Sequence, residues 1–163
     1  MFLRYYVDLS VPFGAAEALL LDDPGSWVPG IAEGAEARGE RLLAEVGFPV
    51  TGDRRVAKAV EITLGEPYRL PAKTMLPLTW KATGPEGLFP ALEADLELAA
   101  MGPERTQLSL SGRYVPPLGL LGRALDRAML HRVAEATVKD FVDQVGQTLL
   151  GLHRVASGTE PAP

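Results

Sequence analysis

The sequence predicts an α+β fold in which a curved antiparallel β-sheet wraps around a long C-terminal α-helix, with two short helices after the first strand. Several segments alternate apolar and polar residues, as half-buried antiparallel strands do. Residues 118–152 contain no proline and repeat apolar residues at the three-and-four spacing of a helix. A helix of about 35 residues would be about 50 Å long and needs a broad apolar partner. The alternating segments supply that partner as a sheet.

The first strand and two short helices are expected at the N-terminus. Residues 2–10 alternate, with Leu3, Tyr5, Val7 and Leu9 on one face. Pro12 opens a helix that reaches residue 21, because proline is tolerated in the first helical turn. Residues 22–25 (Asp-Asp-Pro-Gly) end this helix, and a second short element around Trp27 stops at residues 29–30 (Pro-Gly).

Five further strands are expected at residues 39–48, 55–64, 72–83, 91–100 and 105–115, each with an apolar inward set. The alternation is clearest in residues 91–100, where leucine and alanine face one side and acidic residues face the other. Pro77 marks an edge or a bulge, because proline cannot donate a ladder hydrogen bond. Residues 101–104 are predicted to form a hairpin loop.

Length and composition limit the possible functions. A chain of 163 residues forms one domain, predicted over residues 1–155 with a disordered tail at 156–163. The net charge of −5 disfavours nucleic acid, which is bound through Lys and Arg. No run approaches the roughly 20 apolar residues of a membrane span, and no secretory signal is present. A cytoplasmic protein without stable membrane insertion is expected, and its oligomeric state stays open.

A catalytic centre would need ionisable groups that converge on the cavity side, but the inward faces hold almost only hydrocarbon. His131 and His153 lie too far apart on one helix to share a site, and each is interpreted as a solvated position. The sequence has no cysteine and no paired-histidine spacing for a metal. Glu93, Asp95 and Glu97 are assigned to the solvated outer face. No catalytic residue, metal or cofactor is therefore predicted.

Lys58 breaks the pattern of its strand, because it shares the apolar face with Val56, Val60 and Ile62. A charged group there must extend to the rim, form a salt bridge, or meet the anionic head of a ligand. All three interpretations stay open.

Large aromatic residues on the sheet face small residues on the long helix. Tyr5, Trp80 and Tyr114 lie on inward faces, opposite Ala134, Thr137 and Val138. This arrangement is either ordinary interdigitated packing or a cavity for an apolar molecule. The residues predicted to line such a cavity are Tyr5, Trp27, Leu42, Lys58, Val60, Leu78, Trp80, Leu96, Leu110, Tyr114, Ala134, Thr137, Val138 and Phe141.

Three short sequence motifs resemble those of a known superfamily. They are Asp23-Pro24 to Trp27-Val28-Pro29-Gly30, Leu88-Phe89-Pro90, and Tyr114-Val115-Pro116-Pro117-Leu118-Gly119. With the element order, they make the chain resemble the helix-grip superfamily of START-type lipid-transfer domains, polyketide cyclases and birch-pollen-allergen-like proteins. The resemblance implies a ligand cavity between sheet and helix, but not a subfamily or a function.

Three functional hypotheses follow. The favoured one is a binding or transport protein for a hydrophobic small molecule such as a lipid, an isoprenoid or a polyketide-like aromatic, with entry near residues 27–34 and 84–90. The second is a cyclase or dehydratase, in which Tyr5 or Tyr114 bonds a substrate carbonyl and Lys58 steadies its enolate. The third is a ligand-free interaction domain, which would need exposed apolar area on the outer sheet face.

Overall fold

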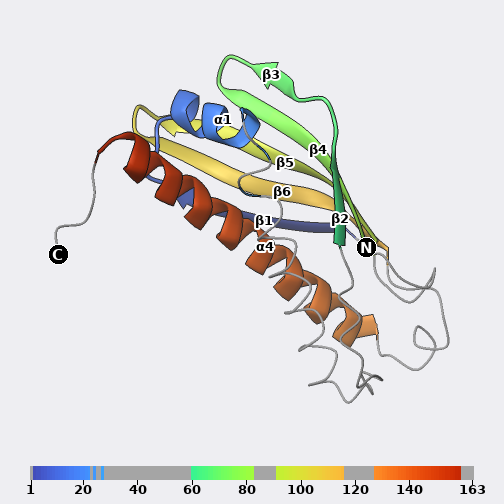
Figure 1. Ribbon diagram of the computed structural model, residues 1–163. Coiled ribbons are helices and arrows are strands. Elements are labelled where there is room, and N and C mark those ends of the chain that lie inside the picture. The colour runs from blue at the N-terminus through green and yellow to red at the C-terminus, as the bar shows by residue number, and fades with distance from the viewer. Residues whose placement is uncertain are drawn as a thin grey trace.

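The computed structural model describes residues 2–22, 24, 27, 60–82, 91–115 and 127–158. Figure 1 shows an open antiparallel sheet with the long helix α4 (Arg127–Ala156) along one face and the short helix α1 (Phe13–Leu21) over one end. The predicted strand at 39–48, the start of the one at 55–64 and most of the second short helix lie outside the described residues. The α+β class, the curved sheet and the long C-terminal helix are confirmed.

The described residues form a six-stranded sheet in which all pairs are antiparallel. Its order is β1 (Phe2–Leu9), β6 (Arg105–Val115), β5 (Ala91–Gly102), β4 (Lys73–Ala82) and β2 (Val60–Leu64), with β3 (Tyr68–Leu70) paired to β4 beyond the end of β2. The sequence did not predict β3, because three residues are too few to show a period of two. The predicted hairpin is confirmed, although β5 continues through Gly102 and only Pro103 and Glu104 form the turn.

The strand alternation places hydrocarbon on the face toward α4 and polar groups on the other face. Leu76, Leu78 and Trp80 of β4 are buried. The apolar set predicted for β5 is buried as well and consists of Leu92, Ala94, Leu96 and Leu98. Glu93 and Asp95 are exposed on the outer face. The sheet therefore has one solvated face and one core face, as the alternation predicted.

Pro77 lies at a break between β2 and β3. β2 ends opposite Leu78, β3 begins opposite Met75, and the Pro77 carbonyl between them accepts a hydrogen bond of 2.7 Å from the Gly65 backbone N–H. In an extended residue the N–H points to the same side as the carbonyl, so the donor that proline lacks would face this break. β4 is thus an interior strand. The irregularity predicted at Pro77 is a gap between β2 and β3, which pair one after the other with the same edge of β4.

Helix α4 ends at Ala156, four residues beyond the predicted end. The Ser157 N–H donates to the His153 carbonyl at 2.9 Å, and Gly158 takes a φ of +68°, the left-handed conformation that glycine adopts most easily after a helix. His153 and Arg154 lie in the last turn, where positive charge favours the helix dipole. Residues 118–126, predicted to begin the helix, lie outside the described part.

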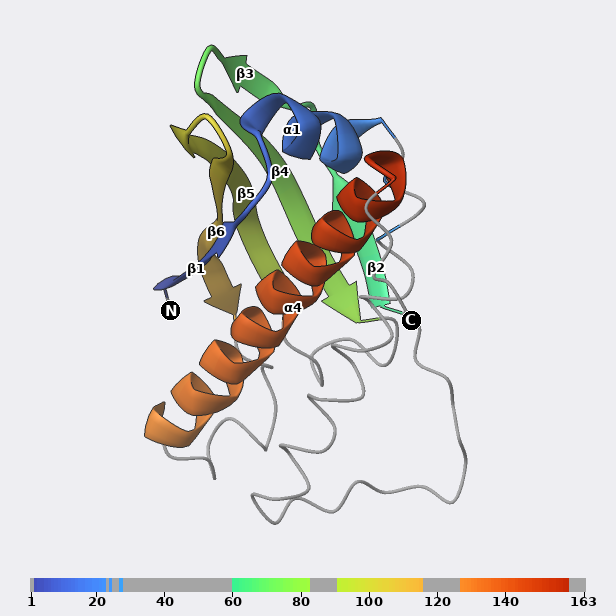
Figure 2. The same cartoon turned by 90° about the vertical axis from the view of Figure 1, so that its left-hand side faces the viewer.

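The C-terminal half of α4 approaches the sheet closely at Gly146. Figure 2 shows the helix crossing the strands diagonally, and its closest packing is on β1 and β6. A Cβ atom at Gly146 would lie 3.2 Å from the methyl carbons of both Val7 and Leu9. Glycine therefore lets this part of the helix lie directly on β1.

A second glycine, Gly112 in β6, lets the sheet bend. A Cβ atom there would lie 2.4 Å from the Ala94 Cβ and 2.4 Å from the Glu93 carbonyl oxygen on β5. Paired residues in a regular antiparallel sheet keep their Cβ atoms about 4.5–5.5 Å apart. The two strands thus come unusually close on the concave face, which is where a glycine permits a sharp bend.

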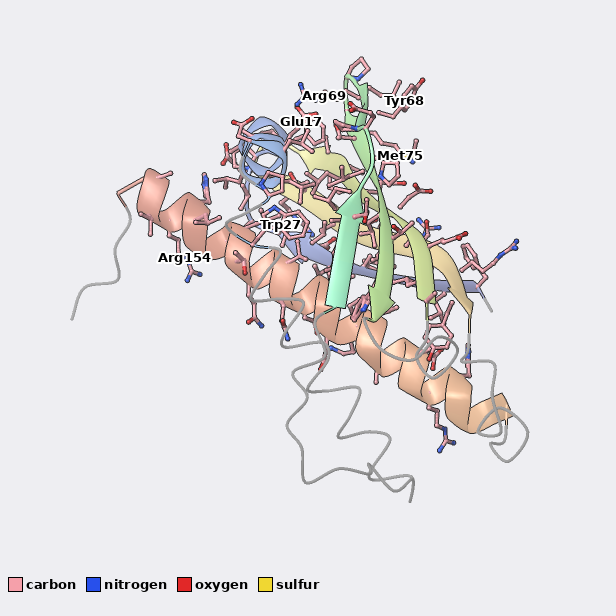
Figure 3. The ribbon with its side chains drawn as sticks, turned by 45° about the vertical axis from the view of Figure 1, so that its right-hand side comes forward. Glu17, Trp27, Tyr68, Arg69, Met75 and Arg154 are labelled. Carbon is pink, nitrogen blue, oxygen red and sulfur yellow. The ribbon has the colours of Figure 1, made fainter. Side chains whose placement is uncertain are left out.

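A polar cluster connects α1 to the far end of the sheet. Glu17 on α1 accepts a hydrogen bond from the buried Thr74 hydroxyl of β4 and lies 3.7 Å from the Arg69 Nε of β3. Figure 3 shows Glu17 directed toward Arg69. The carboxylate therefore satisfies a buried donor and ties the short strand β3 to the first helix.

Candidate functional site

Most described residues of the predicted cavity lining belong to one buried apolar cluster between sheet and helix. Leu42 and Lys58 lie outside the described residues, and Val60 and Thr137 are placed only by their backbones, in β2 and α4. Tyr5 is partly buried and packs against this cluster. The remaining candidates are buried members of it: Trp27, Leu78, Trp80, Leu96, Leu110, Tyr114, Ala134, Val138 and Phe141.

Trp27 is held at the α1 end of this cluster. Its indole N–H donates to the Leu20 carbonyl at 3.1 Å, and its ring is almost fully buried. The bond satisfies the polar group that a buried tryptophan carries. The aromatic body is thereby fixed in the layer between the helices and the sheet (Figure 3).

Trp80 and Phe141 bridge the distance between β4 and α4. Their ring centroids are 5.9 Å apart and their planes are tilted by 45°, a favourable aromatic arrangement. Because α4 lies closest to β1 and β6, its contact with β4 is made through these large side chains. The Ala134 and Ala94 side chains in the same cluster are small.

Tyr114 lies in the same layer, at the end of β6 opposite Leu92. Its side chain is buried, and desolvation raises the pKa of the Tyr114 phenol to about 12 from the ordinary 10.0. The phenol is therefore neutral at physiological pH.

The burial of Tyr114 predicts a loss of stability in strong alkali. Between pH 10 and 12 the unfolded chain gives up this proton while the folded protein keeps it, so the free energy of unfolding falls with rising pH. The stabilisation is complete below pH 10 and its loss is at most about 3 kcal/mol. Urea unfolding across this window should show the fall, and Tyr114→Phe should reduce it. An identical pH slope in both proteins would contradict the prediction.

Tyr5 connects the cluster to a charged pair on α4. Its hydroxyl donates to the Asp143 carboxylate at 3.3 Å, and the Lys139 ammonium lies 5.2 Å from its ring centroid. Lys139 also pairs with Asp143 one helical turn away. The hydrogen bond with Asp143 raises the pKa of the Lys139 ammonium most, and the interaction with Tyr5 raises it further. Sequence analysis missed this pair, although the spacing of four on a helix is a signal for it.

A groove of about 500 Å³ opens between the first half of β1 and the helix beside it. Figure 2 shows the N-terminal half of α4 at the sheet edge where the chain begins. β1 contributes Phe2, Leu3, Arg4 and Tyr5, and α4 contributes His131, Arg132, Glu135, Ala136, Val138 and Lys139. Two of these, Tyr5 and Val138, were among the predicted lining residues. Leu3 and Val138 are nearly buried members of the apolar cluster, so the groove reaches the core.

The two tyrosines, either of which could bond the substrate carbonyl in the cyclase hypothesis, are not adjacent in the sheet. Tyr5 is paired with Leu110, whereas Tyr114 lies four residues further along β6. Their backbones are therefore about 14 Å apart, and the Tyr5 hydroxyl is engaged by Asp143 on α4. Lys58, the third member of that hypothesis, lies outside the described residues.

The histidines are separate, as predicted. His131 Nε2 lies 3.1 Å from the Glu135 carboxylate, and His153 is about 33 Å further along the helix axis. Within the described ranges no group of His, Cys, Asp or Glu side chains is arranged to hold a metal ion. None of the helices in those ranges has a stretch long and apolar enough to cross a membrane.

The outer face of the sheet has exposed apolar side chains only near its edges, as far as the described side chains go. Phe2 and Tyr6 lie on β1, and Tyr68 and Leu70 lie on β3, with Met101 at the end of β5. Between β1 and β3, β5 presents Glu93, Asp95 and Glu97, and Glu97 pairs with Lys73 at 2.7 Å. The acidic row thus belongs to the outer face, and it separates the two apolar groups.

Comparison with known proteins supports the fold. No family model and no curated protein sequence matches the chain. A conserved protein from Geobacillus kaustophilus is 16% identical over 91% of this chain and 95% of its own, with a TM-score of 0.50. The hypothetical protein jhp0584 from Helicobacter pylori is 11% identical over 91% and 87%, with a TM-score of 0.52. The Zhui aromatase/cyclase from Streptomyces sp. R1128 is 15% identical over 97% and 98%, with a TM-score of 0.45.

At these identities the likeness concerns the fold alone. The curved antiparallel sheet, the helix after the first strand and the long C-terminal helix make this a helix-grip fold, as the sequence motifs suggested.

Proposed function

We propose that this protein binds or transports a hydrophobic small molecule between its sheet and its long helix. The observation that carries the proposal is the groove of about 500 Å³ between β1 and α4, because it reaches the apolar cluster at Leu3 and Val138. Its volume falls within the range of small-molecule sites, about 300–1,000 Å³. A lipid, an isoprenoid or a polyketide-like aromatic has the apolar surface that this site would cover.

The direct test is native mass spectrometry of the protein purified from its own host, followed by organic extraction of whatever is bound. We expect a stoichiometric adduct that dissociates on denaturation and partitions into the organic phase. A second measurement uses the neutral fluorescent probe N-phenyl-1-naphthylamine, whose emission rises in an apolar site. The purified protein should bind it saturably. Absence of both the adduct and saturable probe binding would refute the proposal.

A variant that fills the groove should remove binding of the neutral probe. Ala136 lines the groove from α4, so Ala136→Trp places a large ring in the space while keeping a helix-compatible residue. We expect at least a tenfold loss of probe affinity. Gln147→Trp is the matched control, because Gln147 is exposed on the same helix and does not line the groove. If both variants melt like the parent protein and bind the probe with equal affinity, the probe binds outside the groove.

A further inference from the structure

The rim of the groove carries more positive than negative charge. Arg4 of β1 and Arg132 and Lys139 of α4 are cations that line it, and among the described lining residues Glu135 is the single carboxylate. His131 lies 3.1 Å from Glu135, and Lys139 pairs with Asp143 just outside the groove. The described lining thus has a local excess of positive charge in a chain whose net charge is −5.

The two arginines are available to a ligand. Both are exposed, and neither has an ion-pair partner among the described residues. They lie on the two opposite walls, one on the edge strand and one on the helix. A guanidinium presents a planar set of donors that matches a carboxylate or phosphate. A ligand head group between the walls would therefore meet an arginine from each side.

The deeper part of the groove is apolar, since Leu3 and Val138 connect it to the core and the Tyr5 ring adds an aromatic surface. We propose that the groove binds a free amphiphile with an anionic head group and a single apolar tail, with the head group held by Arg4 and Arg132 and the tail lying on Leu3, Tyr5 and Val138. This inference rests on the proposed function and specifies the ligand class. Charge complementarity at the rim is its basis, because a neutral apolar ligand would use neither arginine.

Calorimetric titration with decanoate and with 1-decanol tests the inference, because the two probes share a chain length and differ in head-group charge. We expect decanoate to bind at least tenfold more tightly, with an affinity that falls as salt is added. Arg4→Gln and Arg132→Gln should each lower decanoate affinity about threefold, as expected for exposed charges, and the double variant about tenfold. Neither should change the affinity for 1-decanol.

Arg154→Gln is the matched control, because Arg154 is an exposed arginine in the last turn of the same helix, away from the groove (Figure 3). It should leave both affinities unchanged. Equal binding of acid and alcohol would overturn the anionic head group while leaving the proposed function intact. If neither decanoate nor 1-decanol bound, the inference would be overturned, and the proposed function with it only if N-phenyl-1-naphthylamine binding and a native adduct were absent as well. Sedimentation with phosphatidylglycerol vesicles but no binding of free decanoate would also overturn the inference, in favour of a membrane surface.

Discussion

Replacing Gly112 with alanine is expected to destabilise the protein by about 3 kcal/mol, although it adds a single methyl group. The new Cβ would lie 2.4 Å from the Ala94 Cβ and 2.4 Å from the Glu93 carbonyl oxygen. Because one of these atoms is backbone, β5 and β6 must separate to relieve the contact. Overpacking in a core typically costs about 1–3 kcal/mol, and more where the backbone has to move.

The control is the same change at Gly151 in α4, where a Cβ would meet nothing within 4 Å. Alanine in an exposed helix interior is favoured over glycine by up to about 1 kcal/mol, so Gly151→Ala should stabilise the protein. Urea unfolding of both variants measures the two effects, which should have opposite signs. If Gly112→Ala were as stable as the parent, the close approach of β5 and β6 at this point would be refuted.

The strands and the long helix could be predicted because each has a local signal. In β5, Leu92, Ala94, Leu96 and Leu98 alternate with acidic residues, and such alternation requires only that one face be buried. The strand order and register have no comparable signal, since β1 pairs with β6 about a hundred residues later. The alternation of residues 105–115 places Gly112 on the inward face, but its contact with β5 depends on the pairing of β5 with β6 and could not be derived from one strand.

The candidate site was predictable only in its apolar half. Tyr5 and Val138 were found because each belongs to an apolar stripe, and both line the groove. The cations were missed because Arg4 alternates with the inward residues Leu3 and Tyr5, and an outward residue on β1 can still border a groove beside that strand. Arg132 and Lys139 did carry a signal, since residues seven apart lie on the same side of a helix. Their position on the same groove as Arg4 depends on how α4 lies against β1.

The largest effect of a single truncation is expected at Phe141, where Phe141→Ala should lower the free energy of unfolding by about 3–5 kcal/mol. The ring is fully buried and contacts Trp80 across the layer between α4 and β4. Its removal leaves a cavity between two elements whose backbones the side chains hold apart. Such a loss is a large share of the roughly 5–15 kcal/mol that stabilises a domain.

Three further variants separate the loss of packing at Phe141 from the change in helix propensity that alanine brings. Val155→Ala removes apolar groups from a position of α4 that is 82% exposed, so it should change stability by less than about 0.5 kcal/mol. Trp80→Ala, alone and combined with Phe141→Ala, completes a double-mutant cycle, and residues in contact typically show a coupling of about 0.5–3 kcal/mol. Urea unfolding of the parent protein and the four variants provides the values. Additive losses would mean that Trp80 and Phe141 stabilise the fold independently, whereas coupled losses would identify the aromatic pair as the connection between the long helix and β4.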